Sequence, residues 1–176
     1  MKLQIGVIGS SGDLMQERCE KLAREIGEEI AKRGYILVFG PERDRDSLPT
    51  VAARAAKDAG GDVMGVLYGT GKKGIPDCIT HLIITGVERG GGREFIYVNS
   101  CDAVISIGGG SGTATEMLIA YQNGNKPIIA MEGTGGWSDK MIGQCFDERQ
   151  GRTPVIGAKT ANEALDLVER LTAGKS

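Results

Sequence analysis

The sequence of 176 residues contains a single histidine, His81. A Ser-His-Asp or Cys-His mechanism would have to use this residue, and a multi-histidine metal site within one chain is excluded. Because His81 heads the short apolar run at residues 81–85, we expect it to begin a strand. The histidine count therefore disfavours most hydrolase chemistry, and we expect no metal site.

Cysteine offers no framework either. The four cysteines, Cys19, Cys78, Cys101 and Cys145, lie far apart and form no C-x-x-C pair. This spacing excludes a local zinc ribbon and gives no disulfide framework. We expect reduced, partly buried thiols.

Long hydrophobic runs and an excess of one charge are also missing. No run approaches the roughly 18 apolar residues of a membrane span, and the N-terminal apolar stretch becomes Gly-rich too early for a signal peptide. The 21 Lys+Arg against 23 Asp+Glu give a formal charge of −2, which argues against an electrostatic binder of nucleic acid or anionic membranes. We expect a cytoplasmic protein with neither partner.

Glycine, by contrast, is abundant. It supplies 28 of the 176 residues, about twice the usual share. The glycines follow no collagen period and gather at the ends of apolar runs. An α/β protein needs tight turns and close approach of its backbone to a ligand at these places.

Short, β-branched apolar runs that do not alternate recur along the chain and are typical of strands buried on both faces of a parallel sheet. We expect strands at residues 3–8, 35–39, 63–68, 81–85, 103–107, 127–131 and, more weakly, 154–156. Helical spacing predicts helices at 14–33, 51–59, 94–100, 113–122 and from 161 onward. The alternation predicts an α/β fold, a single-domain Rossmann-like protein over residues 1–176. Its doubly wound, mainly parallel sheet has about six to seven strands, with helices on both faces.

Ligands of such sheets bind beyond the carboxyl ends of the strands, so the loops there are candidate sites. The first loop contains Gly9, Ser10, Ser11 and Gly12. A Gly/Ser turn that enters a helix presents backbone N–H groups to a phosphate or carboxylate. The alternative is that Ser10 or Ser11 only caps the helix. Neither a P-loop nor a G-x-G-x-x-G fingerprint is present.

The loop after residues 103–107 carries the most specific signal. Four glycines in five positions are costly in any regular element, and the cost is understandable if the backbone approaches a bulky anion. We predict phosphate binding by Gly108, Gly109, Gly110, Ser111, Gly112 and Thr113, the glycine run. Thr113 can cap the following helix and donate its hydroxyl to phosphate. Glu116 either completes a Thr-x-x-Glu capping box with it or lies as a carboxylate beside the phosphate.

Three weaker features accompany these loops. Arg89 and Arg93 follow residues 81–85 and suit bidentate binding of phosphate or carboxylate, although we expect Arg89 to be a solvated surface residue. The charged segment 42–46 is expected to be solvated, unless Arg43 or Arg45 reaches a ligand phosphate. Trp137 is expected to pack under its loop or at a subunit contact, with base stacking as the alternative.

These residues resemble a known family. The stretch GGGSGTATE, from Gly108 to Glu116, is similar to the pattern PGGxGTxxE of the LOG family, the cytokinin-activating phosphoribohydrolases often mislabelled as lysine decarboxylases. The resemblance extends to the molybdenum cofactor carrier proteins and is closest to small uncharacterised bacterial and archaeal members of the group. In the same register, Arg93 and Glu116 match the family's catalytic arginine and glutamate. No motif identifies a pyridoxal-phosphate lysine, so lysine decarboxylation is set aside.

The resemblance implies a nucleoside 5′-monophosphate whose N-glycosidic bond is cleaved by water, with its phosphate on the glycine run. Glu116 would bind the ribose hydroxyls and stabilise positive charge on the sugar or orient the water. Arg93 would hold Glu116 ionised. No metal or organic cofactor is required for that catalysis, and a homodimer or higher homo-oligomer is implied.

Two functional hypotheses follow. The family's second glycine loop, GGxxGlM, is replaced here by the charged segment 40–47, and Glu94 stands where the enzymes have lysine. The leading hypothesis is therefore a protein that binds a phosphorylated nucleotide or a phosphate-bearing pterin, a molybdopterin-type ligand, at the Gly-rich loops on the C-terminal edge of the sheet. The alternative is a phosphoribohydrolase that uses Arg93 and Glu116.

Overall fold

The computed structural model describes residues 1–12 and 15–173. Strands and helices alternate along that part of the chain. The strands are β1 Gln4–Gly9, β2 Ile36–Phe39, β3 Asp62–Leu67, β4 His81–Ile84, β5 Ala103–Ile107, β6 Ile128–Met131 and β7 Ile156–Ala158. The helices are α1 Glu17–Lys32, α2 Leu48–Asp58, α3 Gly92–Asn99, α4 Ser111–Gln122, α5 Gly136–Met141 and α6 Ala161–Thr172.

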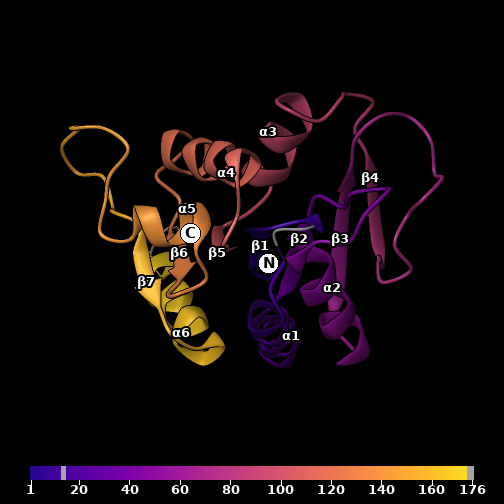
Figure 1. Ribbon diagram of the computed structural model, residues 1–176, viewed down its shortest axis with the longest axis horizontal. Helices are drawn as coiled ribbons and strands as arrows, with labels where there is room; N and C mark the ends of the chain where they lie inside the picture. The colour runs from indigo at the N-terminus through magenta and orange to yellow at the C-terminus, as the bar shows by residue number, and fades with distance from the viewer. Residues whose placement is uncertain (13–14, 174–176) are drawn as a thin grey trace.

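The strands form one parallel sheet in the order β4-β3-β2-β1-β5-β6-β7. Helices α1, α2 and α6 cover one face, and α3, α4 and α5 cover the other (Figure 1). The chain builds outward from β1 to β4 and then returns to the far side of β1 with β5. The carboxyl ends of β1 and β5 therefore flank the reversal of strand order, where open α/β sheets bind ligands. The predicted Rossmann-like α/β sheet is confirmed.

The differences from the predicted elements have local causes. β4 begins at His81 as expected, but it is an edge strand on which His81 and Ile83 are exposed, so it is not buried on both faces. The seventh strand lies at 156–158 rather than 154–156. The sequence does not predict α5, which has only six residues and begins at Gly136 with a φ of +61°.

The starts of four helices also differ from the prediction. α3 and α4 begin two residues earlier than predicted, at Gly92 and Ser111. α2 begins at Leu48 because Ser47 caps it, accepting a hydrogen bond from the Thr50 N–H at 3.2 Å, and because Pro49 suits the first turn. α1 begins at Glu17. Residue Leu14, where we predict its start, lies outside the described residues.

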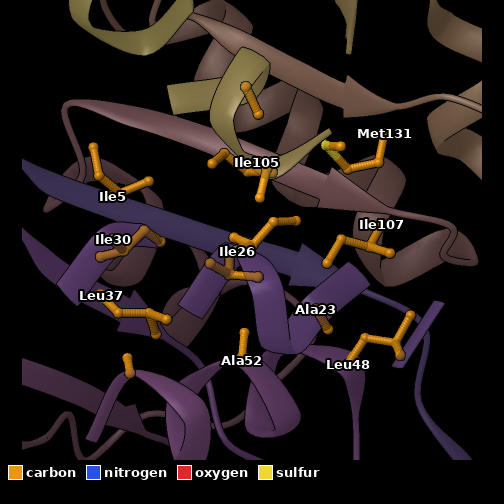
Figure 2. Packing of buried hydrophobic residues seen from close by; sticks show 14 of the residues in the cluster. Ile5, Ala23, Ile26, Ile30, Leu37, Leu48, Ala52, Ile105, Ile107 and Met131 are labelled. Carbon is orange, nitrogen blue, oxygen red and sulfur yellow. The ribbon is translucent and has the colours of Figure 1, made fainter. Parts of the chain in front are cut away.

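Apolar side chains fill the space on both faces of the sheet. In Figure 2, Ile26 and Ile30 of α1 lie against Ile5 of β1 and Ile105 of β5, and all four side chains are fully buried. A second cluster lies beneath α3, α4 and α5. No helix that the structure describes is long and apolar enough to cross a membrane.

The thiols are as expected. Cys19, Cys78 and Cys101 are buried, Cys145 is exposed, and all four are free.

The close contact between α1 and α2 depends on Gly27. A Cβ at this position would lie 2.0 Å from the carbonyl oxygen of Ala52 and 3.0 Å from the nitrogen of Ala56. Alanine has a higher helix propensity than glycine, by about 1 kcal/mol. The backbones of α1 and α2 must nevertheless move apart to make room for its Cβ. We expect Gly27→Ala to lower the free energy of unfolding by about 2–3 kcal/mol, measured by urea denaturation.

The control for Gly27→Ala is Gly71→Ala, since a Cβ on Gly71 would meet open space. We expect that variant to lie within about 0.5 kcal/mol of the wild type. Equal stability of the two variants would show that α1 and α2 tolerate wider spacing.

Candidate ligand-binding site at the carboxyl edge of the sheet

A cavity of about 590 Å³ lies at the carboxyl ends of β1 and β2, against the beginning of α4. Its volume is within the usual range of small-molecule sites. The loops after β1 and β2, the segment around the start of α3, and the first turns of α4 line it. The lining residues are Val7, Gly9, Ser11, Gly40, Glu42, Arg45, Ser47, Pro49, Arg89, Gly90, Arg93, Glu94, Tyr97, Gly110, Ser111, Gly112, Thr113, Thr115 and Glu116. Among the predicted site residues, Ser10, Gly108 and Gly109 lie outside this lining.

The beginning of the glycine run is held by the protein itself. The N–H of Gly108 donates to Thr134 Oγ1 at 2.9 Å, and the N–H of Gly109 donates to Ser10 Oγ at 2.8 Å. The carbonyl oxygens of these two glycines accept from the N–H groups of Ser138 at 3.1 Å and Trp137 at 2.9 Å. Gly108 and Gly109 have φ values of +63° and +98°, which favour glycine. These bonds fix the shape of the loop from two sides.

The loop after β1 does not cap α1. Ser10 instead bonds the glycine run, and its carbonyl oxygen accepts from the N–H of Leu48 at 2.9 Å. Ser11 pairs with Ser47 in an isolated antiparallel bridge, and the residue at the N-cap of α1 is Gln16. The alternative role of Ser10 or Ser11 as a helix cap is therefore wrong.

The second half of the glycine run begins α4 and faces the cavity. Gly110 is the N-cap of this helix, and no side chain caps it. In the described part of the chain, no acceptor bonds the N–H groups of Ser111, Gly112 and Thr113. The positive end of the helix dipole lies at the same place. Unbonded N–H groups at a helix N-terminus are suited to hold an anion, and the three residues that carry them line the cavity.

The capping box proposed for Thr113 and Glu116 is wrong, because Thr113 is the third residue of α4 and its side chain does not cap the helix. Glu116 lies one turn further on and lines the cavity. It forms no hydrogen bond or ion pair within residues 1–12 and 15–173. The functional alternative for Glu116 stays a prediction.

The side chain of Arg93 is only 4% exposed, and its guanidinium group lies beside Gly40. Its Nε and Nη2 donate to Glu94 Oε1 at 3.0 and 2.8 Å, and its Nη2 lies 3.6 Å from Glu42 Oε1. Its Nη1 is buried and has no partner among the described residues. Burial raises the pKa of Glu94, but the Arg93 charge and the Gly91 N–H outweigh it, so the pKa lies below its ordinary value.

Burial raises the pKa of Glu116 to about 8, against the opposing effect of Arg93, and the nearby carboxylates of Glu94 and Glu42 raise it further. The resemblance implied that Arg93 holds Glu116 ionised. Arg93 instead forms its ion pairs with Glu94 and Glu42. At neutral pH the Glu116 carboxyl is therefore mostly protonated and can donate a hydrogen bond.

This titration predicts a pH-dependent stability. The folded protein keeps the Glu116 proton up to about pH 8, whereas an unfolded chain releases it near the ordinary value of 4.5. The folded state then binds more protons between these values, so this group makes stability fall as pH rises through that window. We expect the stability of Glu116→Gln relative to the wild type, in free energy of unfolding, to rise by about 2–4 kcal/mol from pH 5 to pH 9. Urea denaturation at several pH values measures this gain.

The exposed Glu148 supplies the control, because Glu148→Gln removes only a solvated carboxylate. Parallel pH profiles for the wild type and Glu116→Gln would contradict the assigned titration.

The charged segment after β2 is only partly solvated. Residues 44–46 are exposed, whereas the Glu42 side chain is 17% exposed and lies in the cavity. Arg43 donates to the carbonyl oxygens of Tyr68 and Gly71, both at 2.7 Å, and lies over the Tyr68 ring at 5.1 Å. It therefore holds a neighbouring loop and does not line the cavity, whereas Arg45 does.

Arg89 and Trp137 both contact other side chains of the protein. Arg89 is 47% exposed, and its Nη1 lies 2.5 Å from Glu42 Oε2 at the cavity wall, so it is not simply solvated. Trp137 packs against the core beneath α4 and α5, with the ammonium group of Lys140 5.5 Å from its ring. Trp137 does not line the cavity, so its ring packs within the protein and is not placed to stack on a base there.

Comparison with known proteins places this chain among relatives of matching length. A protein of Archaeoglobus fulgidus, described only as uncharacterized, is 36% identical over 139 residues, which cover 76% of this chain and 87% of the relative. The X-ray structure of a protein called TM1055 superposes with a TM-score of 0.82 and is 30% identical, covering 97% of this chain and 99% of that one.

The molybdenum cofactor carrier protein of Chlamydomonas reinhardtii also has the same fold. It is 31% identical, with a TM-score of 0.80 over 98% of this chain and 99% of that one. The model of the SLOG cluster4 family matches residues 2–165. The resemblance to LOG-like and molybdenum cofactor carrier-like proteins is thus confirmed, and the chain belongs to the SLOG cluster4 family.

Proposed function

We propose that this protein binds a phosphate-bearing pterin of the molybdenum cofactor class, or a phosphorylated nucleotide, in the cavity at the beginning of α4. The observation that carries the proposal is the set of unbonded N–H groups of Ser111, Gly112 and Thr113 beside Arg45 and Arg89. The name of the Chlamydomonas relative, a molybdenum cofactor carrier protein, supports the choice of ligand class.

The lining residues fit such a ligand. The N–H groups at the start of α4 would hold its phosphate, with the Thr113 hydroxyl as a further donor. Glu116, protonated at neutral pH, would donate a hydrogen bond to a ring nitrogen or carbonyl of the ligand. Gly9 and Ser11 would contact the same ligand from the β1 side. Ser10, Gly108 and Gly109 would act indirectly, by fixing the loop. When bound, the pterin would supply metal-coordinating and redox chemistry. These residues would hold the pterin and shield it from solvent.

Two measurements test the binding function. The purified protein is examined for absorbance in the near-ultraviolet and visible, where pterins absorb and nucleotides do not. Its melting temperature is then measured with a panel of phosphorylated nucleotides and molybdopterin. A ligand at 100 times its Kd stabilises the folded state by about 2.7 kcal/mol, which is a shift of several degrees. No bound chromophore together with no shift from any compound would refute the proposal.

A phosphoribohydrolase is the second candidate function. It is favoured by Arg93 and Glu116, which line one cavity as the family resemblance implies. Release of ribose 5-phosphate from a panel of nucleoside 5′-monophosphates tests it, with Glu116→Gln in parallel. Release that disappears in the variant would establish hydrolysis. No release from a folded wild type would leave binding as the function.

We also propose that the protein is cytoplasmic and forms a homodimer or higher homo-oligomer. In support of self-association, Phe95, Ile96 and Leu118 are 50%, 38% and 37% exposed on the contacting helices α3 and α4. Light scattering with size-exclusion chromatography measures the assembly.

A further inference from the structure

The side chain of Glu42 lies inside the ligand cavity although the segment that carries it connects two elements at the surface. Its Oε2 lies 2.5 Å from Nη1 of Arg89, and its Oε1 lies 3.6 Å from Nη2 of Arg93. Within the described residues, the side chain forms no other hydrogen bond or ion pair. Glu42 therefore bridges two arginines that face the cavity.

The two carboxylates beside Arg93 differ in how firmly they are held. Glu94 accepts two hydrogen bonds from Arg93 and two more from the backbone N–H groups of Gly90 and Gly91, at 2.8–3.0 Å. Glu42 contacts only guanidinium groups. Its departure breaks no backbone hydrogen bond, whereas the departure of Glu94 would uncap α3.

The balance of charges in the cavity indicates that Glu42 acts as a counter-ion to the arginines. Arg45, Arg89 and Arg93 line it with Glu42, Glu94 and a Glu116 that is protonated at neutral pH. Three positive charges thus face two negative ones, and Glu42 offsets one of the two positive charges of Arg89 and Arg93, while Glu94 also pairs with Arg93. Without Glu42, these arginines would attract any small anion, as paired guanidinium groups do.

We propose that Arg89 and Arg93 form a second anion subsite in which Glu42 is an internal counter-anion, displaced by a second anionic group of the ligand. Within the ligand classes of the proposed function, this subsite favours a nucleotide or pterin derivative that carries a diphosphate or longer phosphoanhydride over one with a single phosphate. This inference rests on the proposed function, in which the first phosphate lies at the beginning of α4. A single anion lacks the second group and leaves Glu42 in place.

The test uses probes without a base: orthophosphate, pyrophosphate and tripolyphosphate, with Kd measured by isothermal titration calorimetry on the full chain. We expect one of the longer anions to bind about tenfold or more tightly than orthophosphate. Glu42→Gln keeps the size of the side chain and removes its charge. We expect it to lower the Kd of that longer anion by a further factor of about 10 and the Kd of orthophosphate by less than about threefold.

Two arginine variants separate the subsite from general electrostatics. Arg89→Gln is expected to reduce the affinity of the longer anion to that of orthophosphate. Arg45→Gln is the matched control, since Arg45 lines the same cavity but does not contact Glu42. We expect it to weaken the binding of all three anions by a similar factor.

The outcomes distinguish this inference from the proposed function. Binding that does not increase with anion length, or a Glu42→Gln effect equal for all three anions, would overturn the second subsite alone. Failure of every anion to bind the folded wild type would count against the proposed function itself.

Discussion

Replacing Gly112 with aspartate is expected to weaken binding of a phosphorylated ligand by about 100-fold or more without harming the fold. Gly112 lies in the first turn of α4, it is exposed, and a Cβ there would meet no atom within 4 Å. An aspartate carboxylate at this position interacts favourably with the helix dipole, so the free energy of unfolding should be unchanged or slightly higher. The same carboxylate would lie at the proposed phosphate position and repel the phosphate.

The matched control for this variant is Gly112→Asn, which has nearly the same shape as aspartate and no charge. We expect it to retain binding within about tenfold of the wild type. Kd values from calorimetry and unfolding curves for both variants complete the measurement. If aspartate and asparagine weaken binding equally, the anion does not lie at the start of α4.

The second large effect is expected at Gly40, where alanine should displace the Arg93 guanidinium. A Cβ on Gly40 would lie 1.7 Å from Arg93 Nη1 and 2.6 Å from its Cζ. The guanidinium cannot move while it keeps its bonds to Glu94, and a displaced Arg93 leaves the buried Glu94 carboxylate without its main charge partner. Breaking a buried ion pair costs about 3–5 kcal/mol, so we expect Gly40→Ala to lose about 3 kcal/mol of stability and most ligand affinity.

A double-mutant cycle identifies the cause of that loss. Arg93→Ala removes the group that a Gly40 Cβ would meet, so adding Gly40→Ala to it should cost less than about 0.5 kcal/mol further. Urea denaturation of the four proteins measures the coupling. Equal costs of Gly40→Ala in both backgrounds would mean that Gly40 serves the backbone and not Arg93.

The predictions that succeed depend on local pattern. The strand at residues 103–107 is observed at Ala103–Ile107 because a β-branched run between Asp102 and the glycine run has no competing local structure. The glycine run is recognisable because so many glycines are costly unless the backbone itself binds something. Helix α5 escapes prediction because its glycine-rich start and six residues give no helical period.

The parts of the site that could not be predicted arise from contacts between distant segments. Nothing near Glu42 in the sequence shows that it meets Arg89, 47 residues away. The protonated state of Glu116 likewise depends on burial by neighbouring elements and on Arg93 having other partners. The signal that was available is Gly40, which directly follows a predicted strand and marks a close approach of another group.

The bonds around Gly108 and Gly109 have a consequence for the divergence of this fold. The shape of the glycine run at Gly108 and Gly109 is set by Ser10, Thr134 and Ser138, none of which lines the cavity. Much of the remaining cavity wall comes from other segments, including the loops at 40–47 and 86–91. Substitutions in those loops would leave the geometry of the glycine run unchanged. Under the proposed function, the ligand specificity can therefore diverge while phosphate binding is kept.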